Sequence, residues 1–159
     1  MHPGFAGGAE DYAIDAAVAR VGLDLDRTAR VGEGEGADGL ALIDAVLRRL
    51  VDGHPRRTVL RNGLGGLSGP AILPIALRMV FQAARAVKLP ICGIGGIASG
   101  EDAVAFLLCG ASAVQVGTIT YTDPGAGIEI RDGIEAYCRQ HGVARVRDLI
   151  GALEPWPAG

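Results

Sequence analysis

The chain has 159 residues, enough for one domain of ordinary size. Its formal net charge is −3 with scattered lysine and arginine, and no apolar run reaches the roughly 20 residues of a membrane span. These features argue against nucleic-acid-binding and membrane proteins. The start lacks the basic and then apolar order of a signal peptide. Cys92, Cys109 and Cys138 are odd in number and far apart, which predicts buried free thiols in a reducing cytoplasm and no metal site.

The first 35 residues have the weakest periodic pattern. A short helix is predicted around residues 12–18, but helical spacing is weak from Asp24 to Glu35, where Gly32 and Gly34 interrupt it. Residues 1–35 are therefore predicted to be a degraded N-terminal segment, separate from the main domain.

A clearer pattern begins at residue 36. The turn 36–39 leads into an apolar strand over residues 40–43, and the same order recurs at 110–113 before a strand over 113–116. Two such turns predict repeated strand–helix units and a parallel sheet. The stretch between residues 44 and 62 contains a basic pair, Arg48 and Arg49, a turn at 52–55 and a possible short strand at 58–60.

A glycine-rich loop at residues 65–70 precedes the most regular predicted helix. Proline at position 70 suits the first turn of a helix. The apolar residues that follow recur at helical spacing and predict one buried stripe: Ile72, Ile75, Ala76, Met79, Val80, Ala83 and Val87.

The stretch 89–118 is predicted to form the centre of the fold. Residues 91–94 read as a strand buried on both faces, and Ser99 with Asp102 predicts the cap of a helix that ends at Gly110. A glycine pair follows the first strand at 95–96, and Gly-Thr follows the second at 117–118. Parallel strands bring such loops to one sheet edge, where their N–H groups suit a phosphate. Spacing alone leaves open whether these glycines only make tight turns. A helix over about 128–140 and a short one over 145–150 complete the pattern.

The sequences GGLSGPAILPIALRMV and ICGIGGIASGEDAVAFLLCGASAVQVGT resemble the C-terminal portion of a bacterial class 1 dihydroorotate dehydrogenase. The Ser-Gly-Pro most resembles the type 1B catalytic subunit, which pairs with an iron–sulfur and FAD subunit. The resemblance implies a cytoplasmic enzyme of pyrimidine biosynthesis that oxidises dihydroorotate to orotate, with FMN in a (β/α)₈ TIM barrel. Carried over by position, the residues in contact with FMN would be Ile43, Gly69, Gly95, Gly96, Gly117 and Thr118.

The chain departs from the family pattern in the substrate and catalytic positions. Family members have Ile-Asn-Thr where this chain has Ile43-Asp44-Ala45, so the substrate-contacting positions Asp44 and Ala45 have lost two N–H donors and a hydroxyl. The flavin-contacting lysine would fall at Ala17, and the catalytic Cys or Ser would fall before Met1. No catalytic residue is therefore expected in this chain. His54, Arg57 and Asn62 are poor substitutes, because a base must first reach the proton.

A complete barrel takes about 250 residues, whereas three strands are predicted here, ending at Ile43, Ile94 and Val116. We therefore expect an α/β fold of the parallel (β/α) barrel family, present as an incomplete barrel of roughly the last three βα units over residues 36–152, with a tail at 153–159. Its uncovered edges predict self-association. The function implied is dihydroorotate oxidation; the alternative is an inactive truncated homologue that only binds FMN or phosphate, or associates with other subunits. Another phosphate-binding barrel enzyme is less favoured, since the sequence around Ile43 follows the dehydrogenase pattern.

Overall fold

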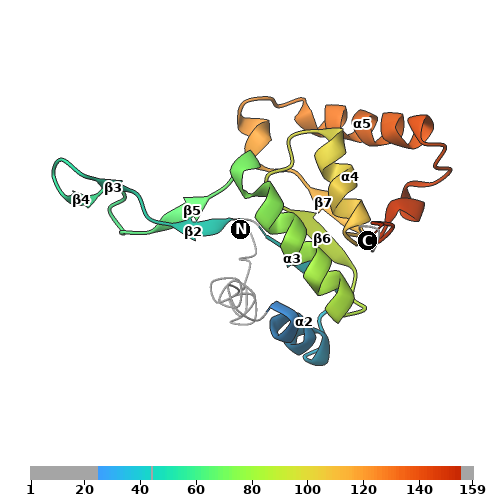
Figure 1. The fold of residues 1–159 in the computed structure, drawn as a ribbon, viewed down its shortest axis with the longest axis horizontal. Coiled ribbons are helices and arrows are strands. Elements are labelled where there is room, and N and C mark those ends of the chain that lie inside the picture. The colour runs from blue at the N-terminus through green and yellow to red at the C-terminus, as the bar shows by residue number, and fades with distance from the viewer. Residues whose placement is uncertain (1–24, 44, 155–159) are drawn as a thin grey trace, which may run out of the picture.

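The computed structural model describes residues 25–43 and 45–154 (Figure 1). A three-stranded parallel sheet is flanked by helices, and a narrow two-stranded ribbon projects from this body (Figure 1). The elements, in chain order, are α2 (Leu25–Gly34), β1 (Leu40–Leu42), β2 (Val46–Arg48), β3 (Val51–Asp52), β4 (Arg57–Thr58), β5 (Gly65–Leu67), η1 (Pro70–Ile72), α3 (Leu73–Ala86), β6 (Ile91–Ile94), α4 (Gly100–Leu108), β7 (Ala113–Gln115), η2 (Thr118–Tyr121), α5 (Ala126–Gln140) and η3 (Val146–Leu149).

The parallel sheet has the order β1–β6–β7, which confirms the predicted parallel pairing. Leu40 pairs with Ile91 on one side of β6, and Cys92 pairs with Ala113 on the other. Helices α3 and α4 both pack against one face of this sheet (Figure 1). The two strand–helix crossovers therefore put their helices on the same side, as in a barrel wall.

The two faces of β6 differ in burial, so the prediction of a strand buried on both faces is wrong. Ile91 and Gly93 are buried under the helices, whereas Cys92 and Ile94 point to the opposite face and are only half-buried. On that opposite face the neighbouring Ala41 and Ala113 are exposed. The reason is that both helices lie on one side, and the rest of the described chain adds no second layer across the sheet.

The helix-covered face holds the core. Phe106 of α4 is fully buried, and its ring lies so close to β6 that it would clash with a Cβ at Gly93. Six of the seven residues of the predicted apolar stripe are buried, and the exception, Ile75, is 38% exposed. Ile75 lies at the edge of the stripe, where the helix surface turns away from the sheet.

The start of α4 confirms the predicted cap. Ser99 Oγ accepts a hydrogen bond from the Asp102 N–H at 3.1 Å, and Asp102 Oδ2 accepts one from the Ala98 N–H at 3.0 Å. This reciprocal arrangement satisfies two backbone donors at the helix start.

Three helices end in the same way, which explains the repeated turn pattern in the sequence. Gly36, Gly110 and Gly142 have φ values of 87°, 109° and 66° after α2, α4 and α5. In each case the N–H of the residue that follows the glycine donates a hydrogen bond to a carbonyl oxygen five residues earlier than the donor. The N···O distances are 3.0, 3.0 and 2.9 Å. This is the Schellman arrangement, in which glycine is favoured because its φ is positive.

Helix α2 was not predicted, because the apolar spacing of residues 24–35 is weak. In the structure α2 packs against α3, its Ala29 is buried, and Glu33 Oε1 accepts a hydrogen bond from the Lys88 N–H at 2.9 Å. Tertiary contacts therefore override weak local periodicity. The helix predicted around residues 12–18, the position Ala17 and residues 155–159 of the tail lie outside the described residues. The domain limits at residues 36 and 152 stay predictions.

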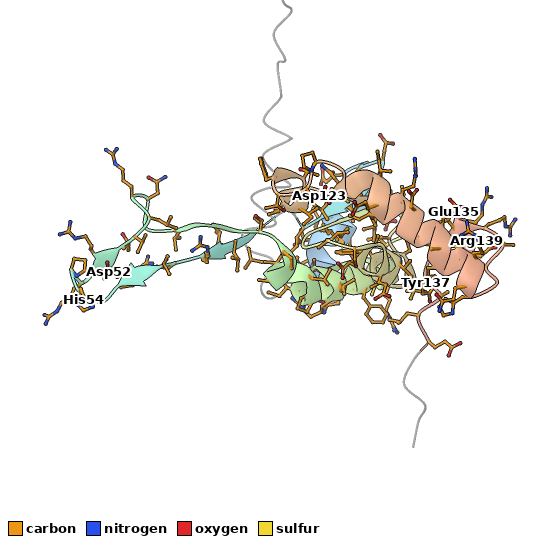
Figure 2. The ribbon with its side chains drawn as sticks, turned by 90° about the horizontal axis from the view of Figure 1, so that it is seen from above. Asp52, His54, Asp123, Glu135, Tyr137 and Arg139 are labelled. Atoms are coloured by element: carbon orange, nitrogen blue, oxygen red, sulfur yellow. The ribbon has the colours of Figure 1, made fainter. Side chains whose placement is uncertain are left out.

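The stretch between β1 and α3 differs most from the sequence prediction. It forms an antiparallel ribbon in which β2 pairs with β5 and β3 pairs with β4 (Figure 1). The predicted turn near the tip is present, and Asp52 Oδ1 accepts a hydrogen bond from the His54 N–H at 3.0 Å. Figure 2 shows Asp52 and His54 at the end of the ribbon, remote from the helical body.

The cysteines are all free, but only Cys138 is buried; Cys92 and Cys109 are half-buried, less than predicted. Burial nevertheless raises the pKa of both half-buried thiols. No helix among the described residues is both long and apolar enough to span a bilayer.

Candidate functional site

The candidate site lies at the carboxyl ends of the parallel strands. One pocket there is lined by five of the six residues that the resemblance assigns to FMN: Gly69, Gly95, Gly96, Gly117 and Thr118. They come from three loops, which precede η1, follow β6 and follow β7. The sheet thus brings together glycines that are up to 48 positions apart, as expected where parallel strands end at one edge.

Ile43, the sixth residue, lies directly beside this pocket. Its N–H donates to the Ile94 carbonyl at 2.8 Å, and its own carbonyl oxygen would lie 2.6 Å from a Cβ at Gly95. Ile43 is itself buried. The structure therefore gathers all six positions, while their contact with FMN stays a prediction.

The backbone conformation after β6 requires glycine at both positions of the pair. Gly95 and Gly96 have φ values of 122° and 79°, and a Cβ at Gly96 would come within 2.8 Å of the Leu73 N and 2.9 Å of the Gly69 carbonyl oxygen. A side chain at either position would be strained and would press on the start of α3. The absence of side chains leaves backbone amides as the surface of the loop.

These amides are free to donate. Within the described part of the chain, the N–H groups of Gly95, Gly96, Gly117 and Thr118 donate to no protein acceptor. The neighbouring Ala98 N–H is by contrast occupied by Asp102. A concave group of unpaired N–H donors is the usual backbone site for a phosphate.

The pocket lining carries no charged side chain; its other members are Pro70, Ile94, Ile97, Gln115 and Ile119. Any anion held there would therefore be bound by backbone N–H dipoles. The phosphoryl group of a larger molecule suits this site, because its oxygens accept hydrogen bonds from several N–H donors that surround it.

The predicted substrate residues are only partly placed. Asp44 lies outside the described residues, and its role stays a prediction. Ala45 is half-buried at the base of the ribbon. A Cβ added at Gly66 would lie 3.2 Å from the Cβ of Ala45. His54, Arg57 and Asn62, considered as substitute bases, all belong to the ribbon and do not line the glycine pocket.

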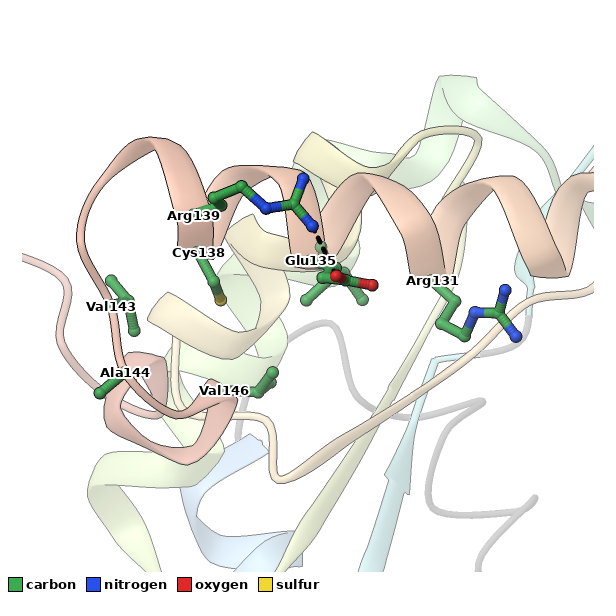
Figure 3. A pocket seen from close by; sticks show the side chains of 8 residues that line it. Arg131, Glu135, Cys138, Arg139, Val143, Ala144 and Val146 are labelled. Atoms are coloured by element: carbon green, nitrogen blue, oxygen red, sulfur yellow. Dashed lines mark hydrogen bonds and ion pairs between the residues drawn. The ribbon is translucent and has the colours of Figure 1, made fainter.

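A second pocket, which the sequence did not predict, lies between α5 and η3 (Figure 3). It has a volume of about 470 Å³, and its lining includes Cys138 and Val143. Arg139 at its rim pairs with Glu135, and Arg131 pairs with Asp132. Both arginines are exposed and already paired, and the pocket lining contains no buried polar side chain that would orient a ligand. Nowhere in the described residues do three His, Cys, Asp or Glu side chains gather in a way that could hold a metal ion.

Comparisons with known proteins agree with this geometry. The family model described as Dihydroorotate dehydrogenase matches residues 23–137. The catalytic subunit of dihydroorotate dehydrogenase B (NAD(+)) from Porphyromonas gingivalis is 52% identical over 130 residues, which are 82% of this chain and 42% of that protein. The corresponding subunit from Pelobacter propionicus is 56% identical over 119 residues, 75% of this chain and 39% of the relative.

Among solved structures, the ligand-free enzyme from Eimeria tenella matches with a TM-score of 0.70 and 27% identity, over 83% of this chain and 37% of that one. This likeness places the fold in the α/β barrel family. The chain spans less than half the length of the relatives it matches. Sequence, fold and the position of the glycine loops agree: the chain belongs to the dihydroorotate dehydrogenase family and resembles its type 1B catalytic subunits.

Proposed function

We propose that this chain forms the FMN-phosphate-binding part of a dihydroorotate dehydrogenase, which oxidises dihydroorotate to orotate in pyrimidine biosynthesis. The observation that carries the proposal is a set of four N–H groups, from Gly95, Gly96, Gly117 and Thr118, that have no acceptor among the described residues and lie at one pocket at the carboxyl end of the sheet.

FMN fits the residues present. The two glycine loops would surround its phosphate, and the positive φ values of Gly95 and Gly96 favour glycine, so no side chain blocks their backbone amides. Gly69 and Ile43 flank these loops and would contact the rest of the cofactor. Bound FMN would supply the oxidant for the conversion of a C–C single bond to a double bond.

We further propose that the chain provides roughly the last three βα units of the barrel. This is supported by three parallel strands with helices on one face only, and by relatives more than twice as long. On this view Ala41, Cys92 and Ala113 face the barrel interior. The proton-abstracting residue and the flavin-contacting lysine would come from the upstream part of the barrel, and Asp44 and Ala45 would meet the pyrimidine.

An NAD-linked iron–sulfur and FAD subunit is the proposed partner, because the relatives are named catalytic subunits. Self-association through the uncovered sheet edges is also proposed.

The phosphate claim is tested by titrating the chain with FMN and with riboflavin, which lacks the phosphate. We expect FMN to bind at least tenfold more tightly. Gly117→Ala, which adds a methyl where no other atom lies within 4 Å, should reduce this preference by obstructing the phosphate. The control Gly127→Ala, also in open space but in α5, should preserve it. Equal affinity of the wild-type chain for FMN and riboflavin would reject the proposal.

The alternative is an inactive homologue that only binds FMN or phosphate. Anaerobic addition of dihydroorotate to the FMN-bound chain, assembled with the upstream part of the barrel, separates the two functions. Loss of flavin absorbance would establish oxidation, whereas unchanged absorbance with FMN still bound would favour the inactive homologue.

A further inference from the structure

The loop after β7 carries a hydroxyl group that the proposed FMN site does not use. Thr120 lies in η2, two residues after Thr118, and it does not line the glycine pocket. Its Oγ1 nevertheless donates a hydrogen bond to the Gly117 carbonyl oxygen at 2.7 Å. The Thr120 N–H donates to the same oxygen at 2.9 Å. One carbonyl group of the pocket loop therefore accepts two hydrogen bonds from a single residue.

These two bonds fix the direction of an N–H group that the proposed function assigns to the phosphate. The Gly117 carbonyl and the Thr118 N–H belong to one peptide plane, and in a trans peptide they point in opposite directions. Whatever holds the carbonyl therefore also holds the N–H. Thr118 lines the pocket, and its N–H has no acceptor among the described residues.

The same bonds make this N–H a better donor. Hydrogen bonds in a chain polarise one another, so a peptide whose carbonyl accepts strongly also donates more strongly through its N–H. A carbonyl oxygen has two lone pairs, and Thr120 supplies a separate donor for each. None of the described residues that line the pocket is charged. The direction and strength of backbone donors therefore decide how well this pocket binds an anion.

The loop after β6 holds its peptide in a different way. The Ile94 carbonyl shares a peptide plane with the Gly95 N–H, and it accepts a hydrogen bond from the Ile43 N–H at 2.8 Å. That donor directly follows the neighbouring strand β1, so the backbone of the sheet orients the Gly95 amide. The Gly117 carbonyl is instead held from within its own loop. For the loop after β7, a side chain thus does what a neighbouring backbone does after β6.

A second threonine in the same loop provides a natural control. Thr122 Oγ1 donates to the Ile119 carbonyl at 3.0 Å, with the same three-residue spacing, and both threonines are exposed. The peptide that this bond holds carries the Thr120 N–H, which already donates to Gly117. Thr122 therefore makes the same kind of bond without orienting an N–H that is open to a ligand.

We propose that Thr120 is a positioning residue for the phosphate-binding loop, because its hydroxyl fixes and polarises the peptide between Gly117 and Thr118. This inference rests on the proposed function, in which the Thr118 amide binds the phosphate of FMN. A donor that is already oriented binds more tightly, since less conformational freedom is lost on binding. Thr120 itself is not expected to touch the cofactor.

The test measures the affinity of the full chain for FMN and for riboflavin; the ratio of the two affinities is the FMN preference. Thr120→Val removes the hydroxyl but keeps the branched shape, and it should lower the FMN preference about fivefold, the factor expected for one lost hydrogen bond. Thr120→Ser keeps the hydroxyl and should stay within twofold of the wild-type preference. The control Thr122→Val should also stay within twofold.

A second measurement follows the peptide without any ligand. In the ¹⁵N-labelled chain, Thr120→Val should lower the heteronuclear NOE of the Thr118 amide, which reports faster motion of that N–H. Thr122→Val should leave this value unchanged. A hydroxyl that only stabilises the fold would lower the denaturation midpoint and weaken both flavins equally. An unchanged FMN preference of this kind would overturn the positioning role.

The outcomes separate this inference from the proposed function. Equal affinity of the wild-type chain for FMN and riboflavin rejects the phosphate site, and the positioning role fails with it. If the wild type prefers FMN and Thr120→Val retains that preference, only the role of Thr120 is rejected. The same conclusion follows if Thr120→Ser loses the preference as Thr120→Val does, or if Thr122→Val loses it equally.

Discussion

The helical body and the projecting ribbon at residues 45–68, the arm, are stabilised in different ways, although the arm lies in the chain between β1 and α3 of the body. In the body, fully buried side chains such as Phe106 and Ile72 lie between α3, α4 and the sheet. In the arm, side chains such as Val51 and Val59 are more than half exposed, and the main internal order is the pairing of short strands. The comparison indicates that the body is specified by its own core, whereas the arm presents a surface.

The largest expected loss of stability follows the truncation of a core side chain in the body. Phe106→Ala should destabilise the chain by about 3–5 kcal/mol, because it removes a fully buried ring and leaves a cavity beside Gly93. Chemical denaturation measures this loss. Tyr121→Ala, at a side chain that is 91% exposed, is the control and should have little effect. Equal effects of the two changes would contradict the account of the core.

An intermediate effect is expected at the cap of α4. Ser99→Ala removes the acceptor for the Asp102 N–H and should cost about 1 kcal/mol. The exposed Ser112, which makes no side-chain hydrogen bond among the described residues, provides the control Ser112→Ala. The denaturation midpoint of Ser99→Ala should be lower than that of Ser112→Ala. An unchanged midpoint for Ser99→Ala would show that the cap does not stabilise the helix.

The smallest expected effect is in the arm. Val59→Thr should change the free energy of unfolding by less than about 0.5 kcal/mol, because the side chain is 55% exposed before the change. The same denaturation measurement applies. A loss above about 1 kcal/mol would mean that the arm packs against the body in solution, and the distinction between the two regions would fail.

The same distinction explains what could be predicted from the sequence. The cap at Ser99, the glycine at position 110 and the strand 91–94 are local signals, since each depends on a few neighbouring residues. The positions of the glycine loops followed from the parallel order of the strands. These parts of the fold and site could therefore be predicted from the sequence.

The remaining features depend on contacts between distant residues. Helix α2 has weak periodicity and is held by α3, including the bond from the Lys88 N–H to Glu33. The arm pairs Val46 with Leu67 across a long loop, and the predicted turn at the tip does not fix that distant register. The one-sided burial of β6 depends on which layers surround the sheet, and an apolar strand sequence does not distinguish one covered face from two.

The central claim is that the four free amides at the strand ends bind the phosphate of FMN. The most direct measurement is an amide-resolved NMR titration of the ¹⁵N-labelled chain with FMN, and then with riboflavin. We predict that the amide signals of Gly95, Gly96, Gly117 and Thr118 shift with FMN and much less with riboflavin, while Gly53 in the arm stays unchanged with both. If these four signals do not move when FMN binds, or move equally with riboflavin, the phosphate does not bind at this edge of the sheet.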